Sequence, residues 1–260
     1  MRKTARSVSA IAVLAVAVIA VPILGLFARV PWSRLNELWS NDTASTAMWM
    51  SLRTSLIATF FCVLLGVPLA WAISNSSEKV RSGARALVTV PVILPPVVGG
   101  IALLSALGRR GVFGGFLSTF GITLPYTQTA VVLSQLFVAM PFLVLSVEGH
   151  FQSMDRGVID AGRVMGFGPL GTFLHVVLPM SRQAIFAGAV LAWARSIGEF
   201  GASITFAGSL KGKTQTLPMA IYELLERDWE LAMGLSVVMV LFAISIIFTL
   251  RSRLVKVSGI

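Results

Sequence analysis

Five stretches of this chain run for 20 residues or more without a single Asp, Glu, Lys or Arg, and a sixth contains only two such charges. An α-helix rises about 1.5 Å per residue, so roughly 20 apolar residues cross a hydrocarbon core about 30 Å thick. The composition agrees, because hydrophobic residues make up 56% and charged residues only 12% of the sequence. Soluble proteins carry about 25% charged residues. The sequence therefore predicts an all-α, polytopic membrane protein.

Six transmembrane helices are predicted, within a single domain over residues 1–260. The uncharged stretch 111–147 is longer than one span, and its first part, rich in Gly, Ser and Thr, is expected to form a loop or a re-entrant piece. A straight helix over 183–210 would measure about 42 Å, so we expect tilt or a break in it. The predicted spans are about 7–28, 54–77, 86–108, 129–147, 183–210 and 231–250.

The first predicted span begins Met-Arg-Lys-Thr-Ala-Arg, which also suits a secretory signal peptide. A cleaved signal has an apolar core of about 7–15 residues. The uncharged core here has 22 residues, from Ser7 to Ala28. We therefore expect an uncleaved first span.

The positions of Lys and Arg predict the orientation. If the N-terminus is cytoplasmic, the cytoplasmic segments carry 12 of these residues and the outer segments carry 7. Cytoplasmic loops of membrane proteins are enriched in Lys and Arg. Both termini are therefore expected in the cytoplasm. The formal charge of +10 is divided among short clusters between spans, which does not favour nucleic-acid binding.

The segment 148–182, between the fourth and fifth predicted spans, is expected to form a cytoplasmic loop of two short helices. The first covers Asp155–Met165 and is ended by Gly166, because glycine readily adopts left-handed backbone angles. Pro169 suits the first position of the second helix, and Leu178-Pro179 is expected to close it. Such a projection suits docking to another protein, although a simple solvated connector would have the same pattern.

This loop resembles the EAA loop of ABC importer permeases. The pattern of that loop is Glu-Ala-Ala, three residues, Gly, nine residues, Ile, any residue and Leu-Pro. Its counterparts here, at the same spacing, are Asp160, Ala161, Gly162, Gly166, Val176, Leu178 and Pro179. Asp for Glu, Gly for the second Ala and Val for Ile are departures. The resemblance implies a coupling helix that sits in a cleft of a separate ATPase subunit, where Asp160 makes polar contacts.

Further segments are similar to the molybdate and tungstate branch of these permeases. They read Ser-Leu-Arg-Thr-Ser at 51–55, Leu-Pro-Pro-Val-Val-Gly-Gly-Ile at 94–101, Ala-Arg-Ser-Ile-Gly-Glu-Phe-Gly-Ala at 194–202, Phe-Ala-Gly at 206–208 and Thr-Gln-Thr-Leu-Pro-Met-Ala-Ile-Tyr at 214–222. Sulfate permeases share the Gly-Glu-Phe-Gly element. Sulfate or thiosulfate therefore stands as the alternative anion.

The resemblance implies the partners as well as the function. It implies a multi-pass protein of the cell (inner) membrane that homodimerises, with the anion path along the dimer interface. Two ATP-binding subunits would dock on the coupling loop, and an extracytoplasmic oxyanion-binding protein would deliver molybdate or tungstate. The permease itself would be no enzyme and would need no cofactor or metal.

Charged residues and helix breakers inside the predicted spans mark a second candidate site. Arg195 and Glu199 lie four residues apart on one helix face and can pair, with Gly198 and Gly201 beside the acid. Ionisable groups at membrane depth normally face protein or water. The pair either locks this helix against its neighbours or lines the anion path or its gate. The helix breakers Pro95 and Pro96 in the third span are candidates for the same path, because broken helices in membranes are tolerated where they adjoin a cavity. The alternative is that they reflect the general enrichment of proline and glycine in transmembrane helices.

The sequence gives little support for metal binding, ATP binding or catalysis by this chain. Cys62 is the single cysteine, and His150 and His175 lack acidic or thiol companions, so no metal site is predicted. Residues 207–214 fit a relaxed phosphate-loop pattern but follow a transmembrane helix on the outer side, where ATP is absent. A membrane-embedded enzyme would need a polar cluster that is missing. An ion-coupled secondary transporter is the nearer alternative, but it would not require the coupling-loop pattern.

Overall fold

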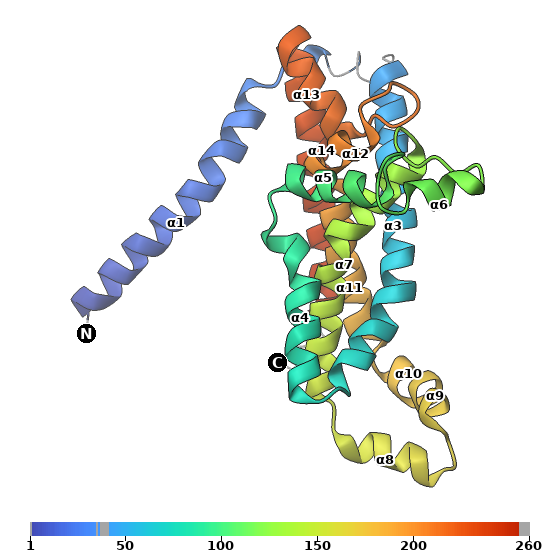
Figure 1. Cartoon of the computed structure of the whole chain (residues 1–260). Helices are drawn as coiled ribbons and strands as arrows, with labels where there is room; N and C mark the ends of the chain where they lie inside the picture. The colour runs from blue at the N-terminus through green and yellow to red at the C-terminus, as the bar shows by residue number, and fades with distance from the viewer. Residues whose placement is uncertain (1, 35, 37–41, 255–260) are drawn as a thin grey trace.

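The computed structural model describes residues 2–34, 36 and 42–254, and all regular secondary structure within these ranges is helical. Most of the helices lie roughly along one axis in an elongated bundle, while α1 extends away from it (Figure 1). The predicted all-α class is confirmed. The elements are α1 (Arg2–Arg29), η1 (Trp32–Arg34), α3 (Asp42–Ser74), α4 (Glu78–Ile93), α5 (Pro96–Leu107), α6 (Gly114–Thr119), α7 (Gln128–Ser153), α8 (Arg156–Val164), α9 (Pro169–Thr172), the π-helical η2 (Phe173–Val177), α10 (Leu178–Met180), α11 (Arg182–Ile197), α12 (Gly201–Ala207), α13 (Leu217–Arg227) and α14 (Trp229–Leu254).

Four of the described helices contain segments long and apolar enough to cross a membrane by themselves. Two further pairs of helices have the required length and composition together, although each pair is bent. By length and composition, the described residues thus provide four candidate spans, or up to six if each bent pair counts as one. The single spans are Ile11–Arg29, Asp42–Ser74, Gln128–Ser153 and Trp229–Ile246, and the bent pairs are Glu78–Ile93 with Pro96–Leu107 and Pro169–Met180 with Arg182–Ile197.

The third predicted span, 86–108, is not one helix. Helix α4 begins earlier, at Glu78, and α5 turns away from it by 114°. The cause is local: the backbone of Leu94 has ψ 134° and that of Pro95 has ψ 135°, both extended. A residue that precedes proline is disfavoured in the helical region, and here Leu94 precedes Pro95 and Pro95 precedes Pro96. Two successive extended residues therefore turn the chain, so that α5 runs across the bundle (Figure 1).

The fifth predicted span, 183–210, contains the break that its length suggested. Helix α11 ends at Ile197, and the short helix α12 starts at Gly201. Gly198 lies at the C-cap of α11, and Phe200 at the N-cap of α12 has φ −128° and ψ −59°. Glycine is a weak helix former, so the chain can leave the helical path here.

The core lies where α3, α7 and α11 pack together. Small residues allow these helices to approach closely: a Cβ atom on Gly66 would lie 2.8 Å from Leu143, and one on Gly188 would lie 3.2 Å from Val147. Small residues at helix contacts are typical of membrane bundles, where close packing replaces the hydrophobic driving force. Near the end of α3, the ring of Trp71 contacts Phe151 of α7 and Phe173 of η2.

Helix α1 contacts the rest of the described chain near its C-terminal end. Leu26, Phe27 and Val30 pack against Met233 and Val237 of α14. The side chains of most residues from 11 to 29 are exposed in the isolated chain, as expected for a helix surrounded by lipid.

Candidate functional site

The first half of the predicted coupling loop is α8 and the turn after it. Gly166 has φ +85°, a left-handed conformation that side chains rarely tolerate. The turn therefore depends on glycine at this position. Gly162 is buried, and a Cβ atom there would lie 3.1 Å from Thr172 Cγ2 and 3.3 Å from Val176 Cγ2. The close contact between α8 and the following helix gives a physical reason for Gly162 where the related pattern has alanine.

The second half of the loop corrects one expectation. Leu178-Pro179 does not close the second short helix, which starts at Pro169 and continues to Met180. The reason is the π-helical turn η2: the Leu178 N–H donates to the Phe173 carbonyl, five residues back. This turn changes the hydrogen-bond register just before Pro179, which has no N–H to donate. The chain then bends by 76° between this helix, which ends at Met180, and α11.

The coupling loop has one face tied to the bundle and one face exposed. Ile159 and Leu178 pack against the hydrophobic core. On the other side, Val164, Met165 and Leu170 are 88%, 65% and 69% exposed, and we call these three residues the loop tip. Asp160, Ala161 and Pro179 are also exposed, whereas Val176 is half-buried. The predicted coupling residues therefore lie together on one projection from the bundle (Figure 1).

Arg195 and Glu199 form the ion pair that their spacing suggested. Arg195 Nη1 lies 2.7 Å from Glu199 Oε2, and the side chains are 28% and 1% exposed. The other carboxylate oxygen, Oε1, accepts a 2.8 Å hydrogen bond from the backbone N–H of Ala202. Glu199 thus does two things at the helix break: it pairs with the end of α11 and stabilises the first turn of α12.

The broken helices α11–α12 and α4–α5 contact each other directly. A Cβ atom on Gly201 would lie 2.5 Å from Pro96 Cβ. A Cβ atom on Gly100 would lie 2.5 Å from Thr205 Cβ and 2.8 Å from the Ala202 carbonyl oxygen. Gly201 and Gly100 therefore permit an approach that no other residue would. Pro95 is exposed at the bend, and Gly198 is exposed at the end of α11.

A cavity of about 120 Å³ lies at the bend between α4 and α5. The structure brings Pro96 and Arg195 together here, and Arg195 is the charged member of this lining. Among the other predicted residues of the second site, Pro95 is adjacent to Pro96, Glu199 pairs with Arg195, and Gly201 contacts Pro96. Gly198 is not brought to the lining, because a Cβ atom there would lie near Ala194 and Met239 instead. The lining comprises Pro91, Val92, Leu94, Pro96, Gly99, Phe137, Val138, Phe142 and Arg195.

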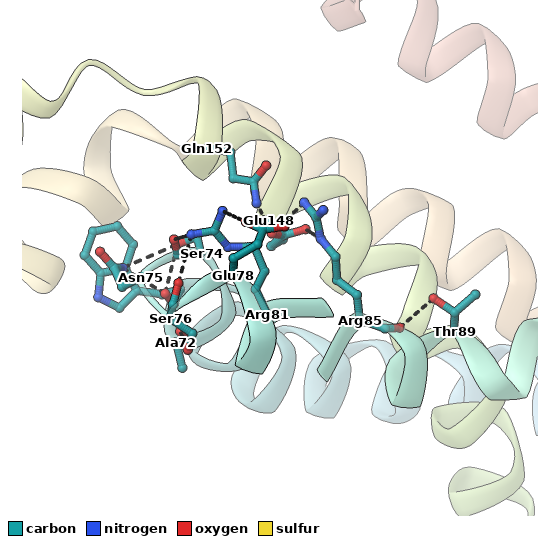
Figure 2. Close-up of polar contacts among 11 residues, drawn as sticks. Ala72, Ser74, Asn75, Ser76, Glu78, Arg81, Arg85, Thr89, Glu148 and Gln152 are labelled. Carbon is teal, nitrogen blue, oxygen red and sulfur yellow. Dashed lines mark hydrogen bonds and ion pairs between the residues drawn. The ribbon is translucent and has the colours of Figure 1, made fainter. Parts of the chain in front are cut away.

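The sequence analysis missed a charge pair at the contact between α4 and α7. Arg85 of α4 and Glu148 of α7 form a bidentate ion pair, with Nε and Nη2 each 2.8 Å from a carboxylate oxygen (Figure 2). Glu148 is only 2% exposed. The sequence analysis assigned it to the cytoplasmic loop, but α7 continues to Ser153. Gln152, one helical turn after Glu148, donates to the same carboxylate. The spacing of these two polar residues, four positions apart, was the sequence signal that could have indicated that α7 continues through them.

Beside this pair, Arg81 connects the start of α4 to the end of α3. Its Nη2 atom donates to the carbonyl oxygens of Ser74 and Ser76, at 3.2 and 2.9 Å (Figure 2). Two basic residues of α4 therefore fix this helix to its neighbours at the same end of the bundle as the coupling loop.

Comparison with protein families gives one family match. The family described as "Binding-protein-dependent transport system inner membrane component" matches residues 62–257. Two curated relatives carry the name "Molybdenum transport system permease protein ModB". The protein from Mycobacterium tuberculosis (strain ATCC 25618 / H37Rv) is 39% identical over 89% of this chain and 88% of its own length. The protein from Escherichia coli (strain K12) is 34% identical over 71% of this chain and 81% of its own.

Solved structures share the fold. A chain of a bacterial alginate ABC transporter, solved in complex with an alginate pentasaccharide-bound periplasmic protein, has a TM-score of 0.73 and 17% identity, covering 94% of this chain and 93% of its own. A chain of the inward-facing MetNI methionine ABC transporter has a TM-score of 0.63 and 18% identity, covering 83% and 95%. At these identities the likeness concerns the arrangement of helices.

Proposed function

The chain belongs to the family of binding-protein-dependent transport system inner membrane components, and we propose that it is the permease subunit of an ATP-driven importer of molybdate. The assignment of molybdate as the transported anion rests on the similarity to proteins named as molybdenum transport permeases, at 39% identity over 89% of the chain. Tungstate has the same tetrahedral, doubly charged form as molybdate and is the second expected cargo. The permease moves the anion without covalent chemistry.

ATP hydrolysis belongs, in this proposal, to a separate ATP-binding subunit that docks on the coupling loop. The exposed apolar side chains of the loop tip support this assignment, because such clusters on a surface mark interaction sites. Asp160 is exposed on the same projection, and we assign to it polar contacts with the ATPase. The left-handed turn at Gly166 holds α8 and the second short helix in the orientation that presents this surface.

The proposed assembly contains two permease copies, two ATP-binding subunits and an extracytoplasmic molybdate-binding protein. The anion path would lie between the permease copies. Both termini would be cytoplasmic, which the distribution of Lys and Arg supports. The exposed length of α1, which contacts its own bundle near one end, would then lie in lipid or beside the second copy.

Reconstitution tests this function. The permease, its ATPase and the binding protein are placed in proteoliposomes, and molybdate uptake is followed with tungstate and sulfate as competitors. We expect uptake that requires both ATP and the binding protein and that tungstate suppresses at lower concentration than sulfate. Preferential suppression by sulfate would assign the chain to sulfate import. Uptake by the permease alone, driven by an ion gradient, would contradict the ATP-driven function.

A further inference from the structure

We propose that Arg195 contacts the oxyanion during its passage, in the cavity at the bend between α4 and α5, and that Glu199 keeps this contact short-lived. This inference rests on the proposed function, because it takes the cargo to be an oxyanion. It assigns different roles to the two members of one ion pair: Arg195 binds the ligand, and Glu199 competes with it.

The cavity offers both space and a positive charge for such a contact. Its volume is about 120 Å³, and Arg195 is the charged side chain in its lining. Arg195 is 28% exposed, unlike its buried partner. A guanidinium carries five N–H donors in a fork that matches oxyanion geometry. The ion pair with Glu199 engages Nη1 of Arg195, so the guanidinium has further N–H donors for a ligand in the cavity.

Glu199 limits how tightly an anion can be held there. Its carboxylate is 2.7 Å from the guanidinium, so an arriving oxyanion meets a positive and a negative charge together. Like charges placed side by side are unfavourable, and this repulsion weakens binding. A transport pathway needs binding that permits entry and also release. The carboxylate retains its hydrogen bond from Ala202 if Arg195 turns toward the ligand.

The Glu199 carboxylate also connects the proposed contact between Arg195 and the anion to the helices that line the cavity. Glu199 holds the first turn of α12, and α12 packs against α5 through Gly201 and Pro96. Pro96 and Gly99 of α5 line the cavity. Engagement of Arg195 by an anion therefore acts, through Glu199, on the packing of α12 against α5.

The chain contains a matched control pair. Arg85 and Glu148 also form an arginine–carboxylate pair within the helical bundle, with a carboxylate that is 2% exposed and a guanidinium that is 40% exposed. Neither residue lines the cavity at the α4–α5 bend. Loss of the Glu148 charge should therefore lower thermal stability, as loss of the Glu199 charge does, without changing how molybdate stabilises the complex.

The test uses the complete permease–ATPase complex and sodium molybdate, with sodium chloride keeping the ionic strength constant. Thermal stability is measured against molybdate concentration, and turnover is measured in proteoliposomes with the binding protein. We expect Glu199→Gln to lower the half-stabilising molybdate concentration by about tenfold or more and to slow turnover. Arg195→Gln should abolish the response, and Arg195→Lys should weaken it because the fork is lost. Glu148→Gln should lower the melting temperature and leave the molybdate midpoint unchanged.

Three results would overturn the inference: an unchanged midpoint in Glu199→Gln, a normal response in Arg195→Gln, or equal midpoint shifts in Glu199→Gln and Glu148→Gln. A parent complex that imports molybdate but shows no stabilisation by it would also overturn the contact, while the proposed function would stand. A parent complex that does not import molybdate would instead contradict the proposed function itself.

Discussion

Arg85 and Glu148 face each other across α4 and α7, and both carboxylate oxygens accept hydrogen bonds from the one guanidinium. The pair links these two helices, and Gln152 adds a third donor to the same carboxylate. Because Glu148 is nearly fully buried, its charge depends on these partners. A buried carboxylate without them would be strongly unfavourable.

Replacing Glu148 by glutamine should therefore lower stability. We expect a loss of about 1–3 kcal/mol, because charged hydrogen bonds are lost while Arg85 stays partly hydrated. The melting temperature of the purified permease in detergent measures this loss. Thr89→Val on the same helix is a control, since the Thr89 hydroxyl bonds only the Arg85 carbonyl within α4 and should matter little. A melting temperature equal to that of the parent would show that the pair does not stabilise the α4–α7 contact.

The turn in the coupling loop gives a second prediction with an internal control. Gly166 and Gly168 both have open space where a Cβ would lie, but only Gly166 has a positive φ. Gly166→Ala should therefore strain the backbone by about 1–2 kcal/mol and weaken association with the ATPase. Gly168 has φ −66°, so the Gly168→Ala variant should associate normally. Co-purification of the tagged ATPase measures both variants. Equal association of the two would mean that the left-handed turn is not needed for docking.

A third prediction concerns acid stability at the end of the bundle opposite the coupling loop (Figure 1). The pKa of Asp228 is held below its ordinary value because the Leu231 N–H donates to it and Arg34 pairs with it. A depressed pKa in the folded state means that this stabilisation is present above the unfolded pKa of about 3.9 and is lost as the pH falls below it. Asp228→Asn should therefore flatten the fall in melting temperature below about pH 4.

A companion variant is Arg34→Gln, which removes the cation from both Asp228 and Glu230. It should also reduce the dependence on acid, while the hydrogen bond from the Leu231 N–H to Asp228 remains. An acid profile of Asp228→Asn that superimposes on that of the parent would contradict the role of this carboxylate.

The predicted orientation of the chain in the membrane gives a fourth prediction. Cys62 is the single cysteine and is buried, so new cysteines in a Cys62→Ala background report accessibility. We expect Met165→Cys to react with a membrane-impermeant maleimide only after the membrane is opened, and Lys213→Cys to react in intact cells; both side chains are exposed. Reaction of both in intact cells would place the coupling loop and the 208–216 loop on the same side and contradict the topology.

Much of the coupling loop could be predicted from the sequence, because its structure is local. Gly166 and Pro169 set the turn and the second helix through backbone properties that single residues carry. The π-helical turn before Pro179 could not be predicted, since it accompanies the burial of Phe173 and Val177 against the bundle, a tertiary effect. Counting charges also could not reveal the 114° bend between α4 and α5, because a charge-free stretch has the same composition whether it is straight or bent.

The last prediction separates the two bonds of Glu199. Glu199→Gln removes the charge opposite Arg195 but keeps an amide oxygen that can accept from Ala202, whereas Glu199→Ala removes both contacts. The alanine variant should therefore lose about 0.5–2 kcal/mol more than the glutamine variant, the usual cost of losing a hydrogen bond at a helix start. In a double-mutant cycle on thermal stability, Arg195→Gln combined with Glu199→Gln should be less destabilised than the sum of the single changes, because neither charge is then left unpaired. A coupling of about 0.5–3 kcal/mol is expected. Strict additivity would mean that the ion pair contributes nothing, and equal losses in Glu199→Gln and Glu199→Ala would mean that the hydrogen bond to α12 does not stabilise the helix break.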